Sequence, residues 1–193
     1  PHKTVRRQRQ MCIRDSICGS RSPLPSPGRA ESCVLVEAGD DIYIFDMGNG
    51  SVNNLQEFQV PWPNVKAVLI THMHSDHMAD LPDAHLLSWI QGRNSPLMVF
   101  GPEGINLVTK GFELAYSADY QYRNEHHGEE IPPMSVSGFN AVEIIDNELI
   151  PNDTPGLEIL PFLVDHHPVN SSFGFKVSYK GRTVVISGDT IHD

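Results

Sequence analysis

The motif His72-x-His74-x-Asp76-His77 constrains this chain more than any other feature, because it holds four side chains of metal-ligand type within six residues. It follows residues 66–70, a mostly apolar, β-rich run that predicts a buried strand. Side chains at i and i+2 of an extended backbone point to the same side, so His72 and His74 can reach one ion. Asp76 and His77 lie past the bend and can reach a second point. The alternative is a polar loop rich in histidine by chance, which we disfavour because a strand end does not normally supply clustered, uncompensated imidazole and carboxylate groups.

Two later motifs also follow predicted strands. In Asp165-His166-His167-Pro168 one histidine could be a third ligand for the first metal, although a solvated loop is the alternative. In Ser187-Gly188-Asp189-Thr190 the carboxylate of Asp189 could bridge two metals, although the same four residues also suit a plain turn.

A fourth motif, residues 45–50, places Asp46 directly after another predicted strand. Asp46 could accept a hydrogen bond from a ligating histidine and so orient it, or it could cap a turn or helix. Two other residues are given structural rather than functional roles. We interpret Trp62, between two prolines, as an apolar packing anchor, and His85 as a surface or packing residue.

The order of predicted elements indicates a mixed, layered α/β fold. Residues 32–38 and 41–45 predict a hairpin, and residues 118–155 are polar and predict long loops or an insertion. The other predicted strands are 66–70, 97–100, 157–164, 173–179 and 183–187, and the predicted helices are 78–91 and 102–115.

The first 16 residues differ from the rest of the chain. They are basic, show no apolar periodicity and lack the apolar core of a signal peptide, so secretion is not indicated. We expect them to lie outside the fold, which leaves residues 17–193 as the N-terminal and central part of one domain. The three cysteines Cys12, Cys18 and Cys33 form an odd, sparse set, which we interpret as thiols rather than a disulfide framework. That usage fits a reducing compartment, and we expect a cytoplasmic protein.

Charge and hydropathy exclude several classes of partner. The formal net charge of −10 disfavours broad binding to a phosphate backbone, which requires a surface rich in lysine and arginine. Bound divalent metals would offset part of this charge and could hold a small anionic substrate. No run approaches the 18 apolar residues that a membrane span requires, so no membrane partner is expected. A homodimer is compatible with the sequence.

Together the four strand-end motifs resemble the metallo-β-lactamase superfamily, and within it the tRNase Z and arylsulfatase-like branches. Residues 22–29 and 173–175 add to the resemblance, which runs from about residue 19 to residue 190. It implies an αββα sandwich, here incomplete at the C-terminus. The implied ligands are His72, His74 and His166 for the first metal, Asp76 and His77 for the second, and Asp189 as the bridge. His166 is preferred to His167 because the family pattern reads Val-Asp-His before Pro-Val. The family carries a further histidine downstream, for which His192 is a weak stand-in.

The resemblance further implies a hydrolase with a dinuclear zinc centre, in which Asp76 is both a ligand and the proton acceptor. Manganese or iron would accept similar ligands. We expect a phosphodiester or sulfate ester as substrate and favour a small anionic ester. The alternatives are a tRNA 3′-processing endonuclease, a lactone or acyl hydrolase, and an inactive truncated fragment.

Overall fold

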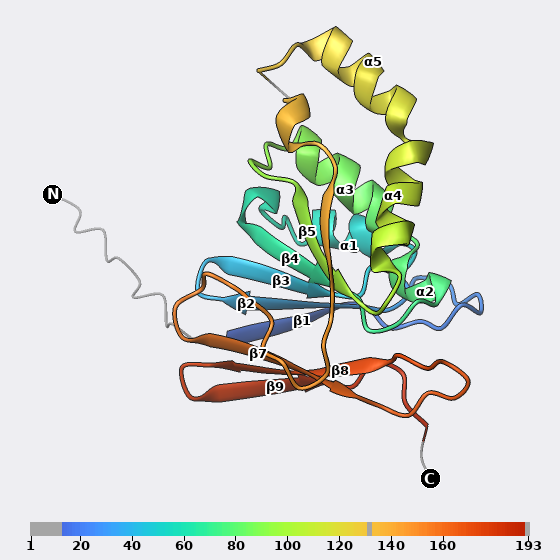
Figure 1. The fold of residues 1–193 in the computed structure, drawn as a ribbon, viewed down its shortest axis with the longest axis vertical. Coiled ribbons are helices and arrows are strands. Elements are labelled where there is room, and N and C mark those ends of the chain that lie inside the picture. The colour runs from blue at the N-terminus through green and yellow to red at the C-terminus, as the bar shows by residue number, and fades with distance from the viewer. Residues whose placement is uncertain (1–12, 131–132, 192–193) are drawn as a thin grey trace, which may run out of the picture.

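Six strands form the larger of two sheets in the computed structural model, which describes residues 13–130 and 133–191 (Figure 1). The strands lie in sequence order. The first three pair antiparallel, whereas β3 to β6 pair parallel. Their bounds are β1 Ile13–Gly19, β2 Cys33–Ala38, β3 Asp41–Phe45, β4 Val65–Leu69, β5 Leu97–Gly101 and β6 Phe139–Glu143. The parallel part matters for function because the carboxyl ends of β3 and β4 meet at one edge of the sheet.

A second, antiparallel sheet packs against the first. It contains β7 (Leu157–Leu163), β8 (Phe173–Tyr179) and β9 (Arg182–Ile186) in that order. Apolar side chains from both sheets form one buried cluster, in which the rings of Phe45 and Phe175 lie 5.1 Å apart. Alternating burial along β7 shows why: its apolar residues at every second position face the larger sheet.

The helices lie on the other face of the six-stranded sheet (Figure 1). Their bounds are α1 Ser51–Glu57, α2 Ser75–Met78, α3 Leu81–Ile90, α4 Ile105–Ala115 and α5 Ser117–His127, with 3-10 turns at Trp62–Asn64 and Met134–Val136. A second apolar cluster fills the space between these helices and the sheet. The predicted mixed α/β fold is confirmed, and the described residues supply three layers in the order α, β, β. Among them, no helix covers the outer face of β7–β9.

The predicted boundary at residue 16 is wrong, because β1 begins at Ile13 and pairs with β2 along its length. Residues 13–16 therefore belong to the larger sheet, while residues 1–12 lie outside the described residues. The basic, unpatterned composition of the first 16 residues concealed β1. The strand is held by backbone hydrogen bonds to β2, and these require no alternation of apolar residues.

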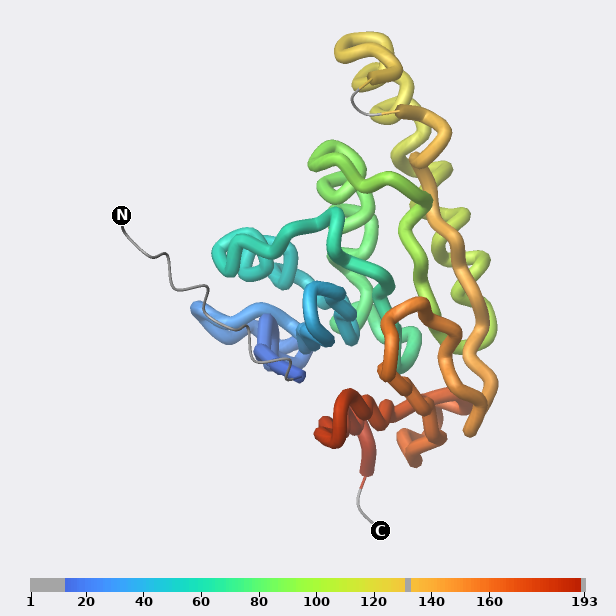
Figure 2. The backbone as a smooth tube through the Cα atoms, turned by 90° about the vertical axis from the view of Figure 1, so that its left-hand side faces the viewer, coloured from blue at the N-terminus to red at the C-terminus, as the bar shows by residue number. Residues whose placement is uncertain are grey.

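Residues 118–155 also differ from the prediction, because they contain α5 and β6 rather than loops alone. The tertiary contacts of α5 explain its stability: Tyr120 is buried against the ring of Trp89 and hydrogen-bonds His85. Figure 2 shows α5 extending away from the β7–β9 end of the molecule. The predicted helix 78–91 corresponds to α3, which begins later, at Leu81, with Pro82 in its first turn. Met78, the first residue of the predicted helix, ends the preceding short helix α2.

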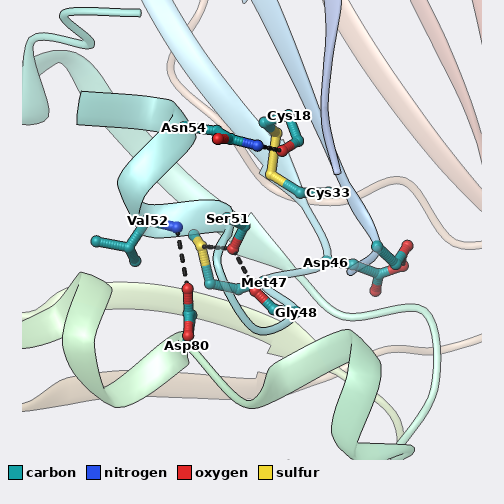
Figure 3. Close-up of a disulfide and its surroundings, with 10 residues drawn as sticks. Cys18, Cys33, Asp46, Met47, Gly48, Ser51, Val52, Asn54 and Asp80 are labelled. Carbon is teal, nitrogen blue, oxygen red and sulfur yellow. Dashed lines mark hydrogen bonds between the residues drawn. A yellow bond between two sulfur atoms is a disulfide. The ribbon is translucent and has the colours of Figure 1, made fainter. Parts of the chain in front are cut away.

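The expectation of free thiols is wrong for two of the cysteines. Cys18 of β1 and Cys33 of β2 form a buried disulfide, with Cα atoms 4.9 Å apart, beside α1 (Figure 3). The Asn54 amide donates a 2.6 Å hydrogen bond to the carbonyl of Cys18. The pair was missed because it depends on the β1–β2 pairing, which the sequence does not reveal. The argument from cysteine usage for a reducing compartment is thereby lost, and a cytoplasmic location stays a prediction. Within the described residues, no helix is long and apolar enough to span a membrane.

Candidate metal centre

The strand ends bring all four motifs together at one edge of the sandwich. Asp46 follows β3 and its N–H donates to the carbonyl of Leu69 at the end of β4 (2.8 Å). Residues 71–77 continue from β4, and the carbonyl of Thr71 accepts a 2.9 Å hydrogen bond from the N–H of Phe173 at the start of β8. This bond joins the two sheets. It holds the loops that carry His166 and Asp189 beside the histidines that follow β4.

Three imidazole groups converge in a first group: His72, His74 and His166. His72 Nε2 lies 2.9 Å from His74 Nδ1, and His166 Nε2 lies 3.4 Å from the same atom. Nitrogen atoms that share a tetrahedral zinc ion at about 2.0–2.1 Å are separated by about 3.3 Å. The three side chains therefore fit a divalent ion with little movement. His167, the rejected alternative to His166, is exposed and belongs to neither group.

A second group adjoins the first. His77 Nε2 lies 3.5 Å from Asp189 Oδ1 and 3.7 Å from Asp76 Oδ2. His72 also lies within reach of His77 and Asp189. One imidazole nitrogen serves one ion, so if His72 holds the first ion, the second is left with His77, Asp76 and Asp189. That mixed nitrogen and oxygen set suits zinc, manganese or iron.

Asp46 accepts hydrogen bonds from several groups at the buried side of the site. It is buried, and its carboxylate accepts hydrogen bonds from Ser32 Oγ (3.0 Å), from the N–H of Thr71 (2.8 Å) and from His77 Nδ1 (2.7 Å). The last bond places the ring proton of His77 on Nδ1, so Nε2 keeps its lone pair for the site. Asp46 has a φ of +62°, a conformation that costs roughly 1–3 kcal/mol and that surrounding contacts must enforce.

Gly48 allows the loop after Asp46 to approach α2 closely. A Cβ at this position would lie 2.1 Å from the carbonyl oxygen of Asp76, so a side chain here would push the loop and α2 apart. Backbone bonds complete the contact, since the N–H of Met47 donates to the carbonyl of His77 at 2.8 Å. The glycine thus fixes the distance between Asp46 and the histidine that it orients.

The two buried histidines respond differently to their surroundings. Burial, with further contributions from His77 and other histidines, lowers the pKa of His72 to about 3, so its ring is neutral and able to ligate. Burial also acts to lower the pKa of His77, but the hydrogen bond to Asp46 and the charges of Asp46, Asp189 and Asp76 outweigh it and raise that pKa overall. Surrounding carboxylates therefore favour positive charge at His77 Nε2, where a metal cation can take the place of a proton.

One side of the site is open to solvent. His72, Asp76 and His77 are buried, whereas His74 and Asp189 are exposed and His166 is half-buried. The predicted ligands are thus brought together, with Asp76 at the margin of the second group, and His192 lies outside the described residues. Thr71 and Ser32 were not predicted. The sequence feature that could have indicated Thr71 is its hydroxyl group, which lies between a buried strand and the first histidine of the motif.

The chain is similar in sequence to several known proteins. A family model described as Anti-Pycsar protein Apyc1 matches residues 26–193. Ribonuclease Z of Mycobacterium marinum is 33% identical over 184 residues, which cover 93% of this chain and 63% of that protein. Ribonuclease Z of Mycobacterium bovis is 33% identical over 181 residues, which cover 91% and 62%. The chain thus spans less than two thirds of the length of these relatives.

Solved structures share the fold. A metallo-β-lactamase fold protein from Bacillus subtilis superposes with a TM-score of 0.68 at 18% identity, covering 92% of this chain and 63% of that one. The short form of human tRNase Z superposes with a TM-score of 0.67 at 22% identity, covering 92% and 69%. With the family model matching most of its length, the chain belongs to the Anti-Pycsar protein Apyc1 family and has a metallo-β-lactamase fold.

Proposed function

We propose that this chain carries the metal centre of a zinc-dependent hydrolase that cleaves phosphodiester bonds in small anionic esters. The convergence of His72, His74 and His166 beside His77 and Asp189 is the observation that carries the proposal. Three imidazole donors next to the carboxylates of Asp76 and Asp189 form a donor set that zinc prefers. Homology to ribonuclease Z supports a metal-dependent hydrolase.

The roles of the residues follow from their surroundings. Bound divalent ions would supply Lewis acidity, which lowers the pKa of water and neutralises charge on an ester oxygen. Asp76 is a buried carboxylate 3.7 Å from His77 Nε2, and we assign it as a ligand and as the acceptor of the proton released by the attacking water. His77 is held by Asp46 with Nε2 facing Asp76 and Asp189. Substrate would approach from the side where His74 and Asp189 are exposed.

The proposal is tested with zinc-loaded protein and bis(4-nitrophenyl) phosphate, an aryl sulfate and an aryl lactone as parallel substrates. We expect turnover of the phosphodiester. Asp76→Ala should lose nearly all of it, while Asp83→Ala on the adjoining helix α3 serves as the matched control. Turnover that survives Asp76→Ala would reject the assignment of Asp76. Preferential turnover of the sulfate ester or lactone would reject the phosphodiester.

RNA is the second candidate substrate, because two relatives at 33% identity are ribonuclease Z proteins. The net charge of −10 opposes binding of a long phosphate backbone, which is why we place a small ester first. A tRNA precursor with a 3′ extension distinguishes the two. Cleavage of this RNA at a higher kcat/KM than the small diester would reverse the order.

A further inference from the structure

We propose that Thr71 is a positioning residue that sets the tautomer of His72, so that the buried carboxylate of Asp46 orients a histidine in each of the two metal groups. The inference rests on the proposed metal centre and goes beyond it by assigning a role to a side chain that is not a ligand. Thr71 is fully buried and lies between β4 and the first histidine.

The hydroxyl of Thr71 contacts three polar side-chain atoms, of which His77 Nδ1 is the farthest at 3.3 Å and already donates its proton to Asp46. Thr71 Oγ1 lies 3.1 Å from Asp46 Oδ2 and 3.0 Å from His72 Nδ1. A carboxylate can only accept, so the hydroxyl donates its one proton to Asp46. Its oxygen is then left to accept the proton of His72 Nδ1–H. The ring of His72 consequently carries its proton on Nδ1, and Nε2 presents a lone pair 2.9 Å from His74 Nδ1.

Asp46 therefore acts on a histidine of each group, on one directly and on the other through Thr71. It binds His77 Nδ1 directly at 2.7 Å, and it reaches His72 Nδ1 through the Thr71 hydroxyl. His77 belongs only to the second group, whereas His72 contributes to the first. Without the hydroxyl, His72 Nδ1 would face the buried Asp46 environment with no acceptor in contact, and the proton would be free to move to Nε2. That tautomer cannot ligate through Nε2.

The rest of Thr71 fixes the geometry of the same corner. Its carbonyl accepts the N–H of Phe173, and its methyl group lies where Gly188 passes, since a Cβ on Gly188 would be 3.1 Å from Thr71 Cγ2. Gly188 directly precedes Asp189. The methyl group and the hydroxyl can therefore be separated by experiment: valine keeps the shape and loses the hydroxyl, whereas serine keeps the hydroxyl and loses the methyl group.

The first test uses the metal-free parent protein with ¹⁵N-labelled histidine at neutral pH. The ring nitrogen shifts of His72 should show the proton on Nδ1. In Thr71→Val the Nε2–H tautomer should become populated, and in Thr71→Ser the shifts should match the parent. A parent protein with the proton of His72 on Nε2 would overturn the inference without use of any variant.

The second test measures zinc affinity by competition with a chromophoric chelator. We expect Thr71→Val to weaken zinc binding by about 10–100-fold, the usual effect of losing a group that orients a ligand, and Thr71→Ser to stay close to the parent. Equal affinity for Thr71→Val and the parent would overturn the inference. A parent that binds no zinc would instead reject the proposed metal centre, while the tautomer measurement would still decide the role of Thr71.

Discussion

His72 and His85 are both fully buried, and burial is the first cause that lowers the pKa of each to about 3, yet their neighbourhoods differ. His72 meets other ligand-type side chains. His85, on α3, stacks on Phe139 with ring centroids 4.0 Å apart and hydrogen-bonds Tyr120 through Nδ1. Neither group of ligand-type side chains found among the described residues includes it. The comparison shows that a lowered histidine pKa reports burial, whereas convergence of donors identifies a site.

Replacing each of these two histidines separately should produce the largest difference in zinc binding. His72→Ala should lose bound zinc and about a thousandfold of any hydrolytic activity, because the loss of several kcal/mol of metal-derived stabilisation corresponds to about three factors of ten. His85→Ala should retain zinc per folded chain and lose only stability. Metal analysis of both folded variants checks the prediction, and equal zinc loss in the two would contradict it.

Reduction of the disulfide should have the next largest effect. Cys18 and Cys33 are 15 residues apart, and a cross-link of that span stabilises a fold by about 3 kcal/mol. Urea unfolding with and without a phosphine reductant should show a loss of this size. The double variant Cys18→Ser, Cys33→Ser should not respond to the reductant. Cys33 directly follows Ser32, which donates a hydrogen bond to Asp46. Reduction should therefore also weaken zinc binding. A stability that reductant leaves unchanged would show that the pair is not oxidised.

The loss of stability at low pH should depend in part on His85. Its pKa is about 3 in the folded protein and 6.5 when unfolded, so the unfolded chain takes up the proton first as pH falls. The neutral ring has no effect above pH 6.5, and destabilisation grows from there down to about pH 3. For the metal-free protein, this contributes about 2 kcal/mol of lost stability between pH 7 and 5. His85→Gln should lose correspondingly less, as measured by urea unfolding at both pH values. An identical loss in the variant would show that His85 is not the group responsible.

Tyr120→Phe should have the smallest effect. It removes the hydroxyl that meets His85 Nδ1 at 3.0 Å while keeping the ring against Trp89, and a buried hydrogen bond of this kind contributes about 1 kcal/mol. Thermal unfolding should register that loss, and zinc affinity should not change. A change in zinc affinity would mean that the two buried histidine clusters are coupled.

Local patterns in the sequence were sufficient to predict much of the fold. Period-two alternation and apolar runs predicted the core strands, and for β3 and β8 the predicted bounds agree with the structure. The convergence of the candidate ligands was predictable because they are adjacent in sequence or follow strands that end at one edge of the sandwich. His72, His74 and His166 were assembled from two distant motifs on this basis together with the family resemblance.

What the sequence did not reveal depends on partners far away in the chain. β1 forms because β2 offers it backbone groups, and the Cys18–Cys33 disulfide follows from that pairing. α5 has a polar sequence and is held by single contacts such as Tyr120 with His85. Thr71 acquires its role only when β3 brings Asp46 beside β4. None of these interactions leaves a periodic signal in its own segment.

Zinc stoichiometry tests the central claim most directly. We predict two zinc ions per chain in the purified protein, with the ion held by His72, His74 and His166 lost in His74→Ala, measured by elemental analysis against protein concentration. His167→Ala, at an exposed neighbour of the proposed ligand His166, is the matched control and should keep both ions. A chain that binds no zinc, or that keeps its zinc unchanged in His74→Ala, would contradict the account.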